Sequence, residues 1–321
     1  MAATDVTGPE LEAVTHGCAL VDRSERGKLA LTGPKAAEFL NGQVTNDVEA
    51  LAPGEGLYAA FLTPKGKMLG DLRVLRTDPG ELLLDTERVA LQALFDLIRR
   101  GVIGWDAELH KRTLQTALLS LLGPRAREVA GAAAAGLPET EHAHREAELG
   151  GAAARLVATA GGVDVLCDAE QAGAVRDALL AAGAVEATEG AADVVRIEAG
   201  RPRYGVDLDD TTIPQEAGLN DRAVSFTKGC YVGQETVARL FYKGKPNRLL
   251  RGLRLSAPVP GATPLRLGER EVGRVGSVAV SPTHGPIGLA LVRRQAEPGA
   301  VLQAGEATAE VVELPFGPPA A

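Results

Sequence analysis

The stretch Arg155-Leu156-Val157-Ala158-Thr159-Ala160-Gly161-Gly162-Val163-Asp164-Val165-Leu166-Cys167 consists of two apolar runs separated by a pair of glycines. A glycine pair favours a tight hairpin turn, because glycine adopts positive φ at little cost. We therefore predict a β-hairpin, with strands at 155–160 and 163–167. The flanking pattern predicts a strand at 115–122, a helix at 124–135, a helix capped by Asp168 and a strand at 194–197. This βαββαβ order is the ferredoxin-like motif.

The segments on either side of this motif have different patterns. On the N-terminal side we predict strands at 29–32, 58–62 and 72–75, and helices at 34–44 and 86–100. After Pro246, short strands separated by Gly and Pro predict a small barrel or sandwich, with strands at 251–255, 265–267, 271–279, 287–291 and 310–314. Residues 131–151 are rich in Ala, Gly, His and Glu, which predicts a surface connection without chemistry.

Length and composition limit the possible classes of protein. A chain of 321 residues is long enough for two or three domains, and 24% charged residues are typical of a soluble globular protein. The net charge of −8 counts against direct nucleic acid binding. Three widely spaced cysteines fit a reducing compartment, and no apolar run reaches the roughly 18 residues of a membrane span. We therefore expect a cytoplasmic protein with no membrane association.

The segment Lys228-Gly229-Cys230-Tyr231-Val232-Gly233-Gln234-Glu235 contains the densest group of chemically active side chains. The ammonium of Lys228 stands close in sequence to the thiol of Cys230, and a nearby positive charge favours the reactive thiolate. The alternative is that Cys230 is a small buried apolar residue, which is common for a free cysteine. From the residues alone, Cys230 is a candidate reactive thiol.

Several ordered motifs resemble one family. Residues 226–239 are similar to the signature of YgfZ-type folate-binding proteins, and residues 213–219 to the segment that precedes it. Residues 22–28, 33–40 and 45–48 resemble the opening shared with the glycine-cleavage T-protein, an aminomethyltransferase. The resemblance covers residues 15–80 and 194–255. YgfZ-type proteins are T-protein relatives that support iron–sulfur enzymes.

The resemblance implies an α+β, T-protein-like multidomain fold. In this organisation, residues 1–114 and 197–245 form a central folate-binding module, residues 115–196 a ferredoxin-like subdomain, and residues 246–321 a C-terminal β-barrel. The implied cofactor is tetrahydrofolate or a one-carbon derivative. Its pterin requires a carboxylate as hydrogen-bond acceptor, and its glutamate tail requires Arg or Lys.

Specific roles follow from the resemblance. Residues 196–205 look like the T-protein element that supplies the pterin-binding glutamate, which gives this role to Glu198. Tyr204 is a candidate pocket wall, and Arg239 a candidate for the folate tail or for a salt bridge with Glu235. The complete predicted cofactor-binding set is Glu198, Tyr204, Arg239, Asn46 and Gln234.

The predicted catalytic set is Cys230, Lys228 and Asp71. Asp71 aligns with an acidic pair in T-proteins that includes their catalytic aspartate, and Gly70 occupies the other position of that pair. This departure counts against aminomethyl transfer. T-proteins also lack a cysteine in the signature segment, whereas YgfZ-type proteins have one. No Cys or His spacing predicts a metal site.

We therefore hypothesise a folate-binding protein that supports iron–sulfur cluster assembly or repair, including enzymes that modify tRNA, through Cys230. Its partners would be iron–sulfur proteins or their assembly factors. One alternative is a glycine-cleavage-type aminomethyltransferase that acts with a lipoyl carrier. Another is a non-catalytic scaffold, so the sequence leaves open whether the protein is an enzyme.

Overall fold

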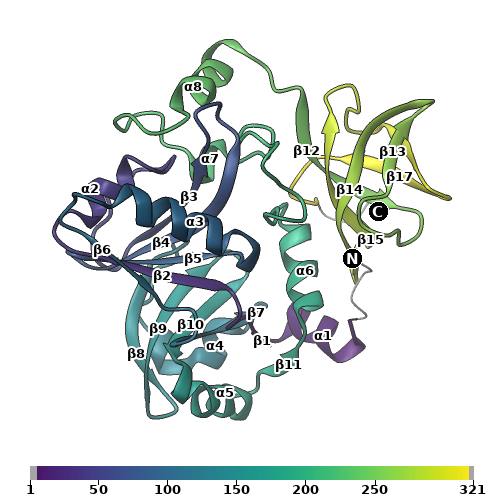
Figure 1. Ribbon diagram of the computed structural model, residues 1–321. Coiled ribbons are helices and arrows are strands. Elements are labelled where there is room, and N and C mark those ends of the chain that lie inside the picture. The colour runs from purple at the N-terminus through teal and green to yellow at the C-terminus, as the bar shows by residue number, and fades with distance from the viewer. Residues whose placement is uncertain (1–5, 318–321) are drawn as a thin grey trace.

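Two open β-sheets and one closed barrel make up the structure (Figure 1), a computed structural model in which residues 6–317 are described. The helices are α1 Gly8–His16, α2 Ala36–Asn41, α3 Arg88–Gly101, α4 Ala126–Ala130, α5 Ala172–Ala181, α6 Glu189–Glu198, α7 Asn220–Ala223 and α8 Gln234–Lys243. None of the helices within residues 6–317 is long and apolar enough to cross a membrane.

The first sheet is antiparallel and has the strand order β3-β4-β5-β2-β6. Its strands are β3 Gly56–Leu62, β4 Met68–Asp78, β5 Glu81–Thr86, β2 Gly27–Thr32 and β6 Glu108–Lys111. Successive side chains of a strand point to opposite faces. In β4, Leu72 and Val74 therefore join the apolar core under α2 and α3, whereas Asp71 and Arg73 face the second sheet. One face of this sheet is thus apolar, and the other carries the buried charged side chains of Asp71 and Arg73.

The second sheet has the strand order β11-β1-β7-β10-β9-β8. Its strands are β11 Val185–Ala187, β1 Ala19–Asp22, β7 Thr116–Leu122, β10 Gly162–Asp168, β9 Ala152–Thr159 and β8 His144–Leu149. The predicted hairpin is confirmed as β9 and β10, which pair in register around the turn at Ala160 and Gly161. Strand β1 comes from the N-terminal segment and pairs with both β7 and β11. This sheet therefore also includes residues outside 115–196.

The predicted strand at 194–197 is wrong, because these residues lie in α6. The β-branched residues of that run favour a strand locally. Over a wider window, however, Ala191, Val194 and Ile197 recur every three residues, as expected for one face of a helix, and all three are buried. The last strand of the ferredoxin-like segment is β11 instead. The segment also contains β8, which was not predicted, so its observed order is βαβββαβ, and the T-protein-like fold class is retained.

The C-terminal residues form a closed barrel of six strands, in the order β12-β15-β14-β13-β16-β17. The strands are β12 Arg248–Leu255, β15 Gly285–Arg293, β14 Arg270–Ser281, β13 Pro264–Leu267, β16 Val301–Ala304 and β17 Ala307–Val312. Five were predicted, and β16 was not. Helix α6 lies between the barrel and the open sheets (Figure 1), and Val194 and Ile197 pack against barrel residues. This helix therefore links the barrel to the sheets.

Candidate functional site

A cavity of about 200 Å³ lies between the two open sheets and the segment from α6 to Tyr204; we call it the intersheet cavity. Seven arginines and five carboxylates line it: Arg23, Arg26, Arg73, Arg196, Arg201, Arg203, Arg222, Asp71, Asp85, Glu87, Glu141 and Asp164. The excess of arginines gives the cavity a positive character. Arginine guanidinium groups bind carboxylates and phosphates well, so the cavity favours an anionic ligand.

Asp71 is a carboxyl group of this cavity whose pKa is raised, whereas the pKa values of Asp85 and Glu141 are lowered by neighbouring arginines. Its side chain lies on β4, is 4% exposed, and accepts a hydrogen bond of 2.5 Å from the hydroxyl of Tyr58. Burial raises the pKa of Asp71 to about 6, although the hydrogen bond from Tyr58 acts in the opposite direction. A carboxyl group with this pKa is present in both protonation states near neutral pH, so it can donate or accept a proton.

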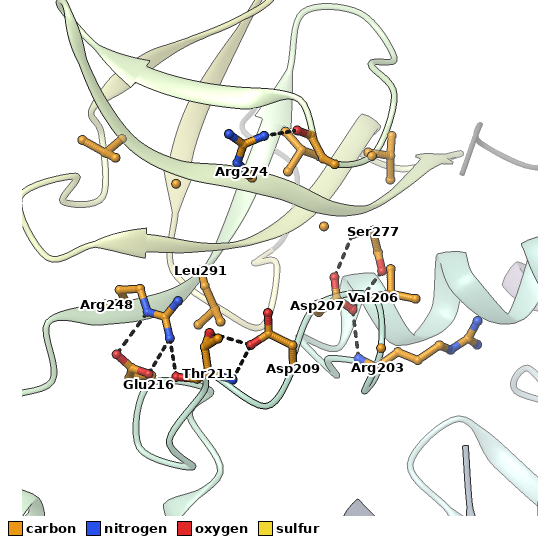
Figure 2. Close-up of a pocket in the computed structure, with 18 of the residues that line it drawn as sticks. Arg203, Val206, Asp207, Asp209, Thr211, Glu216, Arg248, Arg274, Ser277 and Leu291 are labelled. Carbon is orange, nitrogen blue, oxygen red and sulfur yellow. Dashed lines mark hydrogen bonds and ion pairs between the residues drawn. The ribbon is translucent and has the colours of Figure 1, made fainter. Parts of the chain in front are cut away.

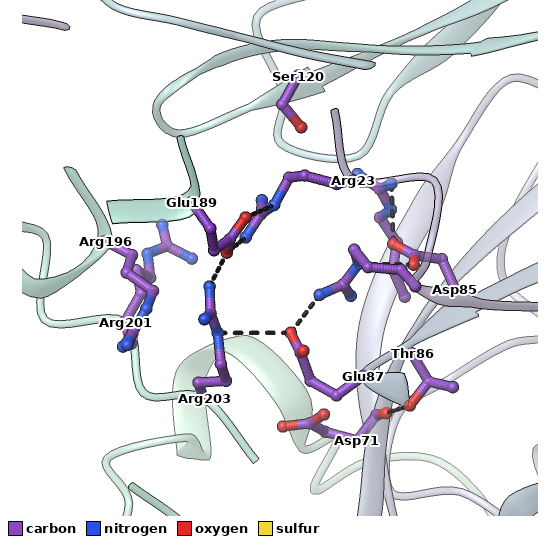
Figure 3. A network of polar contacts seen from close by, with 12 residues as sticks. Arg23, Asp71, Asp85, Thr86, Glu87, Ser120, Glu189, Arg196, Arg201 and Arg203 are labelled. Atoms are coloured by element: carbon purple, nitrogen blue, oxygen red, sulfur yellow. Dashed lines mark hydrogen bonds and ion pairs between the residues drawn. The ribbon is translucent and has the colours of Figure 1, made fainter. Parts of the chain in front are cut away.

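A chain of ion pairs holds the rim of the cavity (Figure 3). Glu189 at the start of α6 pairs with Arg23 at 2.8 Å and also with Arg203. Glu87 pairs with Arg26 and lies 3.8 Å from the guanidinium of Arg203. These contacts join the first sheet to α6 and the segment that follows it. They fix the position of the cavity wall next to Asp71.

Residues 131–151 are more than the predicted surface connection, because they include strand β8 and two residues that line the cavity. Glu141 pairs with Arg201 at 2.9 Å and with Arg222 at 3.5 Å, and His142 also lines the cavity. The guanidinium of Arg222 lies over the ring of Tyr58, 4.9 Å from its centroid. No periodic pattern marked Glu141 and His142 in the sequence. The signal available was the presence of His and Glu in an otherwise Ala- and Gly-rich segment.

The five predicted cofactor-binding residues do not lie together. Tyr204 lines the intersheet cavity, and Asn46 donates hydrogen bonds to the carbonyls of Tyr58 and Arg222 behind the cavity wall. The carboxylate of Glu198 lies on the barrel side of α6, where it accepts a hydrogen bond from Ser281. Gln234 and Arg239 belong to α8, and Arg239 lines a separate cavity of about 400 Å³ along that helix. Of the five, only Tyr204 therefore lines the same cavity as Asp71.

Lys228 does not pair with Cys230 as the sequence suggested. The ammonium of Lys228 donates to the carbonyls of Asn41, Val44 and Asn46, the last two at 2.9 and 2.8 Å. An ammonium group has three N–H donors. All three therefore bind carbonyls, and none is left to bind a thiolate. Lys228 thus ties the signature segment to the end of α2.

Cys230 is exposed and lies outside the intersheet cavity, whereas Cys18 and Cys167 are buried. The exposed thiol precedes α8, whose side chains Phe241 and Tyr242 are 47% and 67% exposed. The structure therefore separates the thiol from the buried carboxyl group of Asp71. Residues 6–317 contain no group of three or more His, Cys, Asp or Glu side chains arranged to hold a metal ion.

A second, larger cavity of about 1040 Å³ lies between the barrel and residues 203–216; we call it the barrel-side cavity (Figure 2). Its carboxylates are engaged by neighbouring side chains. Asp207 binds Arg196 at 3.0 Å and Ser277 at 2.8 Å, and Glu216 binds Arg248 at 2.9 Å. These contacts hold the barrel against the rest of the chain.

Comparison with known proteins agrees with this architecture. Residues 1–228 match the GCVT N-terminal domain, and residues 248–316 match the C-terminal β-barrel domain of CAF17. The fold is also that of the glycine cleavage system aminomethyltransferase T from Bartonella henselae. That structure has a TM-score of 0.84 with 24% identity, and the match covers 98% of this chain and 95% of that one.

Relatives of known sequence are similar along almost the whole chain. An aminomethyltransferase from Thermotoga maritima is 31% identical over 96% of this chain and 88% of its own length. One from Rubrobacter xylanophilus is 32% identical over 96% and 85%. A chloroplast protein from Arabidopsis thaliana, described as a transferase, is 30% identical over 95% and 73%. The chain therefore belongs to the GCVT family of aminomethyltransferase-related proteins, in the form that ends in a CAF17-type barrel.

Proposed function

We propose that this protein binds tetrahydrofolate or a one-carbon derivative in the intersheet cavity. The observation that carries the proposal is the buried carboxyl group of Asp71, with a pKa of about 6, in a cavity rich in arginine. Arg201 and Arg222 suit the carboxylates of a folate tail, and the rings of Tyr58 and Tyr204 suit its flat aromatic parts. These features support a folate better than they support a neutral or cationic ligand.

The loss of one acid beside Asp71 does not remove a carboxylate from the cavity. Gly70 lies on the opposite face of β4, where a Cβ atom would meet Ala90 and Leu94 of α3 at 3.1 Å. An acidic side chain at position 70 would thus face apolar groups of α3 and not the ligand. Asp71 is the acid that faces the cavity, and this chain retains it. The departure at Gly70 therefore does not count against the proposed proton transfer by Asp71.

The first test of the proposal is a calorimetric titration of tetrahydrofolate. We expect Arg222→Met to weaken binding by about tenfold or more, because charge-assisted hydrogen bonds to a carboxylate are strong and the Nε of Arg222 is buried without a partner within residues 6–317. The matched control is Arg125→Met, which removes an exposed arginine just before α4. Equal affinity in all three proteins, or no binding to the wild type, would contradict folate binding in this cavity.

We further propose that the protein is a YgfZ-type member of the family and supports iron–sulfur enzymes through Cys230. The signature around Cys230 and the exposure of its thiol support this role. Its partners would be iron–sulfur proteins or their assembly factors, including enzymes that modify tRNA. Sparse, unpaired cysteines support a reducing compartment such as the cytoplasm.

Alkylation measures the accessibility of the three thiols directly. We expect iodoacetamide to modify Cys230 at least about 100-fold faster than Cys18, because Cys18 is 2% exposed and burial raises its pKa to about 11. Cys167 should also react slowly, since burial raises the pKa of its thiol. Mass spectrometry of the labelled peptides gives the three rates. Similar rates at all three cysteines would show that Cys230 has no special access to reagents.

Aminomethyl transfer is the second candidate function, and the names of the bacterial relatives together with Asp71 favour it. The two functions require different residues, so complementation of a host that lacks its own copy of the protein separates them. If the iron–sulfur role holds, Cys230→Ala loses the activity of an iron–sulfur tRNA-modifying enzyme and Cys18→Ala retains it. If Cys230→Ala retains the full activity of that tRNA-modifying enzyme, the exposed thiol has no role in it. The transferase is favoured if Asp71→Asn then loses methylene transfer.

A further inference from the structure

The backbone of His142 adopts an unusual conformation. Within residues 6–317, only His142 and Ala262 combine a side chain with positive φ, at 70° and 65°. The amide of His142 donates to the carbonyl of Ala158 at 2.8 Å, and the carbonyl of His142 approaches Gly56 so closely that a Cβ there would lie 2.8 Å away. A non-glycine residue in the left-handed region costs of order 1 kcal/mol and persists only where its surroundings enforce it.

The imidazole of His142 is buried and only partly satisfied. Its side chain is 12% exposed and lines the intersheet cavity. Among the residues that the structure describes, Nδ1 has no hydrogen-bond partner, and Nε2 lies 3.8 Å from Oε1 of Glu141, which is beyond hydrogen-bond distance. A buried polar atom without a partner costs about 1–3 kcal/mol. Two unfavourable features therefore coincide at one residue of the cavity wall.

The surroundings keep the imidazole neutral. Burial, together with the positive charges of Arg73, Arg222 and Arg201, lowers the pKa of His142 to about 4. A neutral imidazole has one N–H donor and one acceptor nitrogen. The carboxylate of Glu141 lies on the Nε2 side and favours the proton there. Nδ1 is then the acceptor.

We propose that His142 is a ligand-binding residue of the intersheet cavity, in which Nδ1 accepts a hydrogen bond from an N–H group of the bound folate. This inference rests on the proposed folate-binding function. A pterin ring presents such N–H donors. Most other side chains of the cavity are charged, whereas the imidazole of His142 is a neutral acceptor. Contact with the ligand gives Nδ1 the partner that it lacks in the protein. It also accounts for a histidine at a backbone position that glycine would occupy without strain.

Two substitutions separate ligand contact from a purely structural role. His142→Gly removes the imidazole and suits φ of 70°, so the midpoint of thermal unfolding should not fall. The dissociation constant of tetrahydrofolate should rise by about tenfold, since one hydrogen bond to a buried group is lost. Ala262→Gly removes the same kind of backbone strain in the barrel and should leave the dissociation constant unchanged.

Nitrogen NMR of histidine-labelled protein provides the second readout, with the His142 signals assigned by their absence in His142→Asn. Saturating tetrahydrofolate should shift the Nδ1 resonance of His142 in the direction of an accepted hydrogen bond. If the wild type binds tetrahydrofolate but His142→Gly binds equally well and the Nδ1 resonance does not move, this inference is overturned while the proposed function stands. If the wild type does not bind tetrahydrofolate, the proposed function and the contact made by His142 both fail.

Discussion

Replacing Asp71 by Asn is expected to reduce folate-dependent aminomethyl transfer by about 100-fold or more, while tetrahydrofolate still binds. The amide keeps the shape of the side chain and the acceptor for the Tyr58 hydroxyl, but it cannot exchange a proton with the substrate. In the wild type, Asp71 would donate a proton to the departing nitrogen of the aminomethyl group and become a carboxylate. Methylene transfer from an aminomethyl-lipoyl carrier to tetrahydrofolate measures the effect.

The control for this variant is Asp177→Asn, which changes an exposed carboxylate on α5 and should retain full transfer. If the wild type shows transfer and Asp71→Asn transfers at the same rate, Asp71 has no role in the chemistry. If the wild type shows no transfer but binds tetrahydrofolate, the iron–sulfur role becomes the better description of the protein.

The same substitution should stabilise the fold at neutral pH. Burial raises the pKa of Asp71 from 3.8 to about 6, so the folded state binds the proton more tightly than the unfolded state. The free energy of unfolding therefore falls as pH rises between these two values, by up to about 3 kcal/mol. Asp71→Asn removes this loss, so it should be more stable than the wild type above pH 6 and equal to it near pH 4. Urea unfolding over this pH range tests the sign.

Replacing Arg73 by Met is expected to destabilise the fold by about 3–5 kcal/mol, because it leaves two buried carboxylates without their shared cation. Arg73 extends from β4 of the first sheet and lies 2.6 Å from Asp164 of the second sheet. It also lies 2.9 Å from Asp85, and its side chain is 7% exposed. Unfolding in urea, followed by circular dichroism, gives the loss.

The double variant Arg73→Met, Asp164→Leu is the control for this interpretation. It removes Asp164, whose carboxylate loses its arginine partner in Arg73→Met, while Asp85 retains its ion pair with Arg26. We therefore expect the double variant to recover part of the stability lost in Arg73→Met. A single variant as stable as the wild type would show that the sheets do not depend on this contact. A double variant less stable than Arg73→Met would show that packing, and not charge, accounts for the loss.

Much of the fold was evident in the sequence, because local pattern and tertiary structure agree there. The hairpin of β9 and β10 was predicted because Gly161 and Gly162 separate two apolar runs, and the barrel strands because Gly and Pro separate them. Helix α6 was missed because Val194 and Ile197 also suit a strand locally, and the spacing that indicates a helix is visible only when Ala191 is included.

The site was less accessible to sequence reasoning than the fold. Asp71 was identified from a family motif, and the alternation of β4 explains why it faces the cavity. The partners of Lys228 could not be inferred, since they are backbone carbonyls from residues 41–46, far away in the sequence. Glu141 and His142 were missed because a loop that enters a cavity has no periodicity to reveal it. The role of Glu198 stays a prediction, as its carboxylate binds Ser281 in this structure.

The most direct test of the central claim is a crystal structure of the protein with tetrahydrofolate. We predict electron density for the ligand in the intersheet cavity, with one of its polar atoms within about 3 Å of the carboxyl group of Asp71. The same structure would show whether an N–H group of the pterin reaches Nδ1 of His142. Ligand density confined to the barrel-side cavity, or an empty intersheet cavity at saturating tetrahydrofolate, would contradict the account.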